Sequence, residues 1–466
     1  MKEFTRHDFG DDFFWGVSTS ALQIEGASHS HGKGANIWDE FSSQKNKILN
    51  NDSPAISCNF YDNYKQDIDL VVELNIPNFR ISLSWSRIFP NGIGEVNFYG
   101  VKFYHDVIDY CLSKGVEPWV TLYHWDLPLD LEVKGGWKNR DITKWFNHYV
   151  DFCAKEFGTK VKYWMVLNEP MVFTGAGYFM GVHAPGKKGL ANFLPALHHA
   201  VLCQAIGFNA IKKVCPDSKV GTTFSCSYIT PYSSAKRDVD AAKRMDTLLN
   251  RTFIEPSLGL GYPMESLPLL KQIKKYILPG DEELMKVDFD FIGIQNYTRE
   301  VVKYSFYIPY LFARIVPADK RKVYHTLMDW EVYPESIYEM IKKFSHYKNI
   351  KQIIVTENGA SFPDEVKGNR VHDEDRLMFL KNYIAQVYRA KHEGFKVSGY
   401  FVWTLLDNFE WAEGYRQRFG LVYVNFNSQR RVIKDSGYWY KQFLGFKTHA
   451  ARNNEARREK VETYHS

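Results

Sequence analysis

Eight short apolar runs recur along the chain, and amphipathic stretches separate them. This alternation is typical of βα units, whose strands form a parallel sheet. No Pro-rich or Gly-rich linker divides the 466 residues, so we predict one (β/α)8 barrel, an α/β fold with inserted βα loops, over residues 1–447 and a charged tail over residues 448–466. The predicted strands are Phe13–Ser18, Asn78–Ser82, Glu117–Leu122, Tyr163–Asn168, Lys219–Thr223, Asp290–Gln295, Ile353–Thr356 and Val397–Trp403, and amphipathic helices are predicted at Tyr64–Leu74, Phe103–Ser113, Thr143–Phe157 and Asp375–His392.

Two of these runs end in a carboxylate. Ile353–Thr356 is apolar and β-branched, which is typical of a strand buried on both faces, and Glu357 follows it directly. Tyr163–Asn168 has the same design, with Glu169 and then Pro170 behind it. A carboxylate at the end of a buried strand costs free energy of desolvation unless it is paired or used in chemistry. On one barrel the two glutamates would face each other across its mouth.

Charge and cysteine content exclude several other classes of protein. The net charge of +5 is spread along the chain outside its C-terminus, so we expect no nucleic-acid or membrane partner. We find no stretch that is long and apolar enough to span a bilayer, and the first residues carry acids instead of an apolar signal core. The six cysteines lack Cys-x-x-Cys spacing, which favours free thiols in a reducing compartment. We therefore expect a cytoplasmic protein.

Polar and aromatic side chains gather where the predicted strands end, which is the edge that carries the active site in such barrels. One residue of this kind would carry no weight, but most of the strands end this way. Aromatic residues make up 16% of the chain and suit flat sugar rings, although they serve cores first. The gathered residues are Gln23 and Glu25, Arg80, His124, Trp125 and Asp126, Asn168 and Glu169, Asn296 and Tyr297, Glu357, and Trp403 with Asn408, Phe409, Glu410 and Trp411.

Other chemistries find little support in this set. His124 with Asp126, and the pair His198-His199, lack a recognised metal-ligand spacing, so we expect no metal and no cofactor. No nucleophile elbow surrounds a Ser or Cys, and no Gly-rich phosphate loop is present. What remains is a pair of carboxylates among amides, His and Trp. Glycoside hydrolysis uses such a pair: one carboxyl protonates the leaving oxygen, and the other attacks or stabilises the anomeric carbon.

Several motifs in a fixed order are highly specific. They are Phe14-Trp15-Gly16 with Thr19-Ser20-Ala21 and Gln23-Ile24-Glu25-Gly26, Arg80-Ile81-Ser82 with Trp85-Ser86-Arg87, Tyr123-His124-Trp125-Asp126-Leu127-Pro128, Asn168-Glu169-Pro170, Thr356-Glu357-Asn358-Gly359, and Asp407-Asn408-Phe409-Glu410-Trp411. By these motifs the sequence resembles the family 1 glycoside hydrolases, the β-glucosidase family, over nearly its whole length. It departs from the family pattern at Leu22, where Tyr is common, at Gln295-Asn296-Tyr297, where Asn-Tyr-Tyr is commoner, and at Asp62-Asn63, where His-Arg is frequent.

The resemblance implies a retaining β-glycosidase that acts on small-molecule β-glycosides or short β-linked oligosaccharides. It implies that Glu169 is the acid/base and Glu357 the nucleophile, with carboxyl groups about 5–5.5 Å apart. It also implies cis peptide bonds at Ala184-Pro185 and Trp403-Thr404. The other implied catalytic residues are Arg80, Tyr297 and Asn168, and the implied substrate-binding residues are Gln23, His124, Trp125, Asn168, Trp330, Trp403, Glu410, Trp411 and Phe419.

Three questions stay open at this level. The phospho-β-glucosidase branch of the family places Ser and Lys near the sugar 6-position, where this chain has Glu410-Trp411, and non-catalytic sugar-binding relatives typically lose a glutamate that this chain keeps. The preference among glucose, galactose and fucose, the aglycone and the oligomeric state are not determined. The long connection Thr298–Trp330 carries an aromatic patch at residues 304–310, which would line a binding entrance or form a packed surface excursion.

Overall fold

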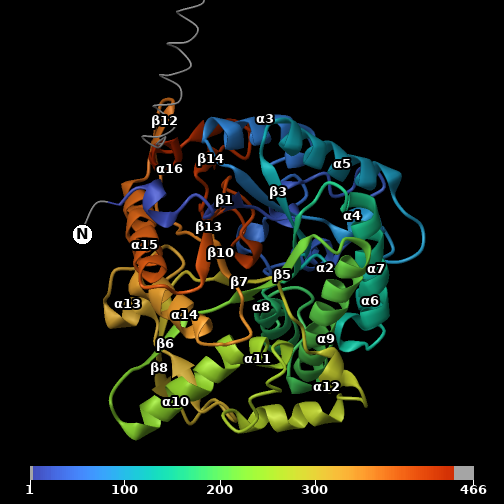
Figure 1. Ribbon diagram of the computed structural model, residues 1–466, viewed down its shortest axis with the longest axis vertical. Coiled ribbons are helices and arrows are strands. Elements are labelled where there is room, and N and C mark those ends of the chain that lie inside the picture. Colours follow the sequence, from blue (N-terminus) through green and yellow to red (C-terminus); the bar gives the residue numbers. More distant parts are fainter. Residues whose placement is uncertain (1–3, 446–466) are drawn as a thin grey trace, which may run out of the picture.

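The computed structural model describes residues 4–445, and a closed barrel of eight parallel strands lies at its centre (Figure 1). The strands pair in the order β1-β13-β10-β7-β5-β4-β3-β2, so β1 closes the barrel between β13 and β2. The predicted (β/α)8 fold is confirmed, and each predicted strand is a barrel strand with ends within two residues of those predicted. The predicted tail over 448–466 lies outside the described residues. The barrel strands are β1 (Phe14–Ser18), β2 (Asn78–Ser82), β3 (Glu117–Tyr123), β4 (Tyr163–Asn168), β5 (Lys219–Ser225), β7 (Phe291–Gln295), β10 (Ile353–Asn358) and β13 (Val397–Trp403).

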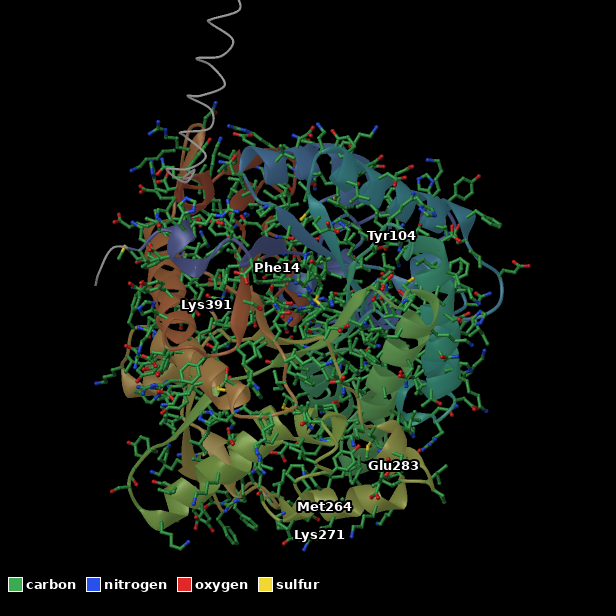
Figure 2. The ribbon with its side chains drawn as sticks, viewed as in Figure 1. Phe14, Tyr104, Met264, Lys271, Glu283 and Lys391 are labelled. Carbon is green, nitrogen blue, oxygen red and sulfur yellow. The ribbon has the colours of Figure 1, made fainter. Side chains whose placement is uncertain are left out.

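Large side chains fill the barrel interior, so that the barrel is a packed core and not a pore (Figure 2). Trp119 stacks on Tyr163 with ring centroids 4.1 Å apart, and Phe14 packs edge-on against both rings. Gly16 leaves room for the ring of Phe401, because a Cβ at Gly16 would lie 2.3 Å from that ring. This packed layer forms a floor beneath the carboxyl ends of the strands. Its members are Phe14, Trp119, Tyr163, Met165, Phe291, Ile354 and Phe401.

Amphipathic helices surround the barrel, as the alternating sequence pattern predicts (Figure 1). The four helices expected from sequence correspond to α3, α5, α7 and α15, each beginning one to five residues earlier than predicted. Helix ends are poorly marked by apolar period alone, since the first turn is often partly exposed. The principal helices are α3 (Phe60–Glu73), α5 (Phe98–Ser113), α7 (Ile142–Phe157), α9 (Leu190–Val214), α14 (Glu335–Ser345), α15 (Glu374–His392) and α16 (Asp435–Gly445).

Helix α9 corrects one expectation from the sequence. Among the described residues it is the one helix that is long and apolar enough to cross a membrane, whereas we expected no such stretch. However, 83% of its apolar window is buried, and the helix packs against α7 and β4. A core helix of a large barrel meets the same criteria of length and composition. The apolar side chains of α9 therefore form part of the protein core.

Short elements inserted after the barrel strands build the rim. The sheet β6-β8-β9 packs against α10 at the lower end of Figure 1, and the hairpins β11-β12 and β14-β15 follow β10 and β13. The inserted elements are α1 (Ala21–Ile24), α2 (Ile37–Ser43), α4 (Trp85–Ile88), α6 (Leu129–Val133), α8 (Pro170–Thr174), β6 (Tyr228–Pro231), α10 (Lys236–Asp246), α11 (Ile254–Ser257), α12 (Asp281–Leu284), β8 (Arg299–Tyr304), β9 (Ala313–Ile315), α13 (Ala318–Arg321), β11 (Glu365–Lys367), β12 (Arg370–His372), β14 (Val422–Val424) and β15 (Arg431–Ile433).

The two ends of the described chain meet beside β1. Arg6 Nη1 donates a hydrogen bond to the carbonyl oxygen of Leu444 at 2.9 Å. Phe9 is buried between Trp15 and Phe443, with ring centroids 4.8 and 6.4 Å away. The N-terminal segment thus covers the outer face of the strand that closes the barrel. The peptide bonds Ala184-Pro185 and Trp403-Thr404 are cis, as expected.

Candidate active site

A cavity of about 350 Å³ opens at the carboxyl ends of the barrel strands. Side chains from the ends of β3, β4, β5, β7, β10 and β13 line it, which is the location that the sequence predicts for the site. Among the described residues, those that line the cavity include five glutamates and no lysine or arginine. The lining residues are His124, Trp125, Glu169, Val172, His183, Ser225, Cys226, Ser227, Tyr297, Thr298, Glu300, Met328, Trp330, Glu357, Trp403, Glu410, Trp411, Ala412, Glu413 and Phe419.

Glu357 lies at the end of β10 and accepts hydrogen bonds from three side chains. Arg80 Nη1 and Gln295 Nε2 donate to its Oε1 at 2.5 and 2.6 Å, and the Tyr297 hydroxyl donates to its Oε2 at 2.6 Å. Burial raises the pKa of Glu357, and the charge of Arg80 and the hydrogen bond from Tyr297 oppose that rise. The three donors also fix the plane of the carboxylate, so one oxygen edge stays in a defined place.

A buried network behind Glu357 orients its partners. Arg80 is fully buried; its Nε donates to Thr121 Oγ1 at 3.0 Å, and its Nη2 donates to Asn168 Oδ1 at 2.5 Å. Asn168 Nδ2 lies 3.0 Å from His124 Nε2. Burial and the charge of Arg80 lower the pKa of His124 well below its usual range, so the imidazole is neutral and can accept this hydrogen bond. The amide of Asn168 thus connects the Arg80 guanidinium to the imidazole on the neighbouring strand.

Glu169 directly follows β4 and precedes α8, which begins at Pro170. Its φ of 45° lies in the left-handed region, which is costly for a residue with a side chain. Trp125 and Trp411, with φ of 79° and 50°, share this feature and line the same cavity. Burial, and then the negative charge of Glu357, raise the pKa of Glu169 well above its ordinary value. A proton shared between the two glutamates is therefore held on Glu169, because three hydrogen-bond donors stabilise the ionised form of Glu357.

Aromatic rings form two walls of the cavity. Trp411 packs between Trp125 and Trp38, with ring centroids 4.4 and 4.7 Å away. Trp38 lies in the first turn of α2, which begins at a capping box in which Asn36 Oδ1 accepts from the backbone nitrogens of residues 38 and 39. In a second group of lining rings, Trp330 lies 5.1 Å from the ring of Tyr297. Flat rings in both groups favour a ligand with flat apolar faces and polar edges.

Gln23 lies behind the cavity and supports Glu410. Its Nε2 donates to the carbonyl oxygen of Phe409 at 2.9 Å and lies 3.3 Å from Glu410 Oε2, while its Oε1 accepts from Ser20 Oγ at 2.7 Å. Burial, and then the charge of Glu357, raise the pKa of Glu410 to about 8. Glu410 therefore takes up a proton as the pH falls below about 8.

The structure brings the residues predicted from sequence into one region of the barrel. Gln23, Arg80 and Asn168 are buried behind the cavity and are not among its lining residues. The predicted residues that line the cavity are His124, Trp125, Glu169, Tyr297, Trp330, Glu357, Trp403, Glu410, Trp411 and Phe419.

Sequence reasoning missed Gln295, whose Nε2 contacts both Glu357 Oε1 at 2.6 Å and Asn168 Oδ1 at 2.7 Å. A polar residue at the end of a buried strand was the available signal, and it was noted only as a departure from a family motif. Glu300 and Met328, which belong to the connection after β7 and line the cavity, were also missed. The aromatic patch at residues 304–310 does not line this cavity. Phe306 and Tyr307 are 73% and 93% exposed, and Tyr310 borders a separate shallow groove next to α10.

The fold and the paired carboxylates define a barrel glycosidase, and comparisons with known proteins agree. The family model described as Glycosyl hydrolase family 1 matches residues 5–449. A 1,4-beta-D-glucan glucohydrolase of Thermotoga neapolitana is 40% identical over 94% of this chain and 98% of that protein. A 6-phospho-beta-glucosidase of Bacillus subtilis is 34% identical over 95% and 98%. A structure of a beta-glucosidase from Thermotoga maritima in complex with deoxynojirimycin has a TM-score of 0.91 at 38% identity, covering 96% of this chain and all of that one.

The chain belongs to glycosyl hydrolase family 1. It is an O-glycosyl hydrolase of the β-glucosidase type, and the family hydrolyses its substrates with retention of anomeric configuration by double displacement.

Proposed function

We propose that this protein hydrolyses unphosphorylated β-D-glucosides, with Glu357 as the nucleophile and Glu169 as the acid/base. The observation that carries the assignment is the unequal environment of the two carboxyls. Arg80, Gln295 and Tyr297 donate to Glu357, whereas burial and the Glu357 charge raise the pKa of Glu169. A nucleophile must be ionised and a general acid protonated at the start of the reaction, and these environments favour that distribution.

One charge would control both steps of the reaction. While Glu357 is ionised, its charge helps to keep Glu169 protonated, so Glu169 can donate to the leaving oxygen. When Glu357 becomes a glycosyl ester its charge is lost, and the pKa of Glu169 falls. Glu169 then accepts the proton of the attacking water, and Glu357 leaves with its charge restored.

The polar end of the cavity supports a sugar without phosphate. Trp403, His124 and Glu410 line it, with the His124 ring 6.1 Å from that of Trp403. The carboxyl oxygens of Glu410 can accept hydrogen bonds from the 4- and 6-hydroxyls of a sugar. A 6-phosphate would lie near Glu410, and among the described residues that line the cavity no lysine or arginine would neutralise it. We infer activity on galactosides and fucosides as well, because these sugars differ from glucose only in groups at this end.

A panel of nitrophenyl glycosides tests the substrate class. We expect higher kcat/KM on β-glucoside than on 6-phospho-β-glucoside, because the described lining residues offer the phosphate no lysine or arginine and the ionised Glu357 repels it. Glu410→Ser should reduce kcat/KM on the plain glucoside by the equivalent of about 0.5–3 kcal/mol, the range that neutral and charged hydrogen bonds span. A preference of the wild-type enzyme for the phosphorylated sugar would overturn the substrate assignment and leave the two catalytic roles untouched.

Azide distinguishes the two carboxylates. Glu169→Ala keeps the nucleophile, so an activated substrate still forms the covalent intermediate, and azide should then release a β-glycosyl azide without needing a base. Glu357→Ala removes the covalent route, so azide that attacks from the vacated side should give the α-glycosyl azide. Product configuration is read by NMR. Azides of one configuration from both variants would contradict the roles assigned here.

We also propose a reducing compartment, such as the cytoplasm, as the location of the protein. The support is the cysteine usage: five of the six thiols are buried, and only Cys215 is partly exposed. Fractionation of the source cells with activity assays would test this, and recovery of the activity outside the cells would contradict it.

A further inference from the structure

The loop that follows β13, residues 404–420, carries five of the cavity-lining residues, namely Glu410, Trp411, Ala412, Glu413 and Phe419. Loops of this length are mobile unless other contacts hold them. The loop must therefore be anchored for Glu410 to keep one position at the polar end of the cavity.

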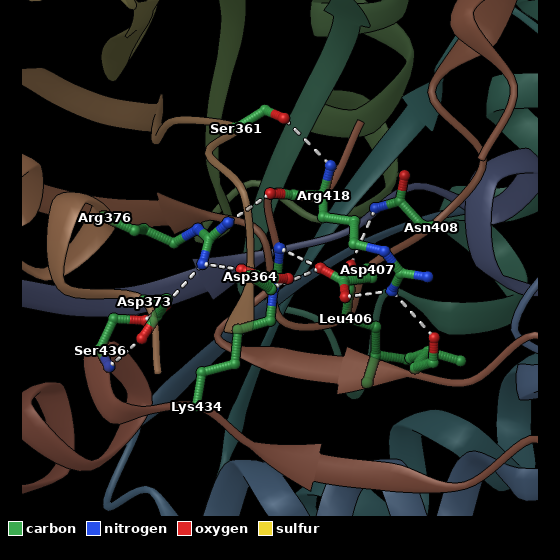
Figure 3. Close-up of polar contacts among 12 residues, drawn as sticks. Ser361, Asp364, Asp373, Arg376, Leu406, Asp407, Asn408, Arg418, Lys434 and Ser436 are labelled. Carbon is green, nitrogen blue, oxygen red and sulfur yellow. Dashed lines mark hydrogen bonds and ion pairs between the residues drawn. The ribbon is translucent and has the colours of Figure 1, made fainter. Parts of the chain in front are cut away.

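Asp407 closes this loop at its base (Figure 3). Its side chain is fully buried, and Oδ1 accepts a hydrogen bond from the backbone nitrogen of Gly420 at 2.9 Å. Oδ2 accepts from Arg418 Nη1 at 2.7 Å. One carboxylate therefore joins the outgoing and returning arms of the loop. Backbone bonds strengthen the same closure, since the nitrogen of Asp407 donates to Val422 and that of Leu421 donates to Thr404.

A buried lysine connects Asp407 to the segment that follows β10. Lys434 is fully buried, and its Nζ lies 2.7 Å from Asp407 Oδ1 and 2.7 Å from Asp364 Oδ2. Asp364 lies seven residues beyond Glu357, so the lysine joins the loop of Glu410 to the continuation of the strand that carries Glu357. A buried ion that loses its partner costs several kcal/mol in real proteins, which makes this link rigid.

Arg376 completes a cluster with three acidic and three basic residues. Its Nη1 binds Asp364 and Asp373 at 2.8 and 2.5 Å, and its Nη2 donates to the carbonyl oxygen of Arg418 at 2.6 Å. Asp373 also accepts from Ser436, at the start of α16. The three negative and three positive formal charges cancel, so each buried ion has a partner of opposite charge within the cluster. The members are Asp364, Asp373, Asp407, Arg376, Arg418 and Lys434.

We propose that Asp407 is a positioning residue that sets the depth and orientation of Glu410 at the sugar-binding end of the cavity. This inference rests on the proposed role of Glu410. Asp407 does not line the cavity, and it acts on Glu410 through the backbone of the two residues between them. On the other side of Glu410, Gln23 holds both the Phe409 carbonyl and the Glu410 carboxylate. The loop is thus held at its base by Asp407 and near its tip by Gln23.

Asp407→Asn in the full chain tests the proposal, because the amide has nearly the same volume but no charge. We expect a fall in kcat/KM on nitrophenyl β-glucoside of about tenfold to hundredfold, as for a displacement of about 1 Å in a binding group. In the Glu410→Ser background the same substitution should cost less than about threefold, since the group it positions is absent. Equal losses in both backgrounds would overturn the proposal.

Asp373→Asn is the matched control, because Asp373 belongs to the same cluster but contacts Arg376 and Ser436 instead of the loop. We expect it to lower the denaturation midpoint with glucoside kinetics nearly unchanged. If both variants lose activity in proportion to lost stability, Asp407 has only a structural role. If Asp407→Asn fails to fold, Arg418→Met, which removes the partly exposed partner of Asp407, should show a smaller loss with the same dependence on Glu410, and a loss independent of Glu410 would overturn the proposal.

The effect of Glu410→Ser alone distinguishes a failure of the proposed function from a failure of this inference. If Glu410→Ser alone leaves glucoside hydrolysis unchanged, the role of Glu410 fails, and with it the substrate assignment. If Glu410→Ser has the expected effect and the Asp407 and Glu410 effects are additive, only the positioning role of Asp407 fails.

Discussion

Gln295 is one of the three hydrogen-bond donors to Glu357. Its Nε2 donates to Glu357 at 2.6 Å, and Gln295→Met keeps the length of the side chain but removes this donor. The pKa of Glu357 should then rise, so the acidic limb of the pH–kcat/KM profile should move to higher pH, and kcat/KM should fall by about tenfold to hundredfold. Profiles on nitrophenyl β-glucoside measure both effects.

A matched control for Gln295 is Gln204→Met, because Gln204 is equally buried but bonds Ser257 and Thr222 outside the cavity. We expect it to lower stability and to leave the acidic limb in place. An unmoved acidic limb in Gln295→Met would show that this amide does not affect the ionisation of Glu357.

Glu410 connects the site to stability. Its pKa is raised to about 8, mainly by burial, whereas a glutamate in an unfolded chain titrates near pH 4. Between these values the folded state binds more protons than the unfolded state, so the free energy of unfolding falls as pH rises. Glu410→Gln removes this dependence. We expect the variant to gain thermal stability over wild type by calorimetry as pH rises from about 4 to 9, and a constant difference would contradict the shift.

At the residue scale, sequence reasoning found the two glutamates because each ends a buried run and precedes a chain-breaking residue. It missed Gln295 because a polar residue in that position reveals neither its rotamer nor the carboxylate across the barrel. Asp407 belonged to a recognised motif, but its partners Lys434 and Asp364 are 27 and 43 residues away along the chain. Such pairings depend on how the inserted loops fold, and apolar periodicity carries no information about that.

At the scale of elements, the barrel strands were predicted well and the inserted sheet was not. Each barrel strand is an apolar run of five to seven residues, and its type and approximate position follow from that pattern. β6 and β8 belong to one small sheet in which Tyr228 pairs with Arg299, and each strand is only partly buried. Their apolar pattern is weak because both strands are short and most of their residues are only partly buried, although the sheet packs on α10. The sequence therefore showed only a long connection.

The close packing of the barrel floor predicts that one added methyl group lowers the free energy of unfolding. In Gly16→Ala the new Cβ would lie 2.3 Å from the ring of Phe401, so we expect a loss of about 1–3 kcal/mol in the free energy of unfolding. Phe401→Leu in the same chain should recover part of that loss, because it frees the space that the methyl group enters. Gly175→Ala is the control, since its nearest neighbour is Met171 Sδ at 3.6 Å. Denaturant titration measures all three, and equal stabilities of Gly16→Ala and wild type would contradict the packing.

For the whole molecule, the closing contact between the chain ends should control global stability without affecting chemistry. Phe9→Ala removes a buried ring from between Trp15 and Phe443, and we expect a loss of about 3–5 kcal/mol in the free energy of unfolding. The expected kcat/KM is that of wild type, since Phe9 does not line the cavity. Phe98→Ala serves as control, because that ring is 79% exposed and its loss should change stability by less than about 0.5 kcal/mol. A Phe9 variant as stable as this control would contradict the closing role.

Because Arg6 contacts Leu444 and brings the two ends of the described chain together, the chain is suited to circular permutation. A chain could begin at Tyr307, run to residue 445, pass over a short linker to residue 4 and end at Phe306, and every strand pair of the barrel would survive. The new break would lie at an exposed tip between β8 and β9, where a cut disturbs little. The strand pairs form a closed ring and the chain ends lie beside one another, so we expect the barrel to tolerate a different order of its eight strands along the chain.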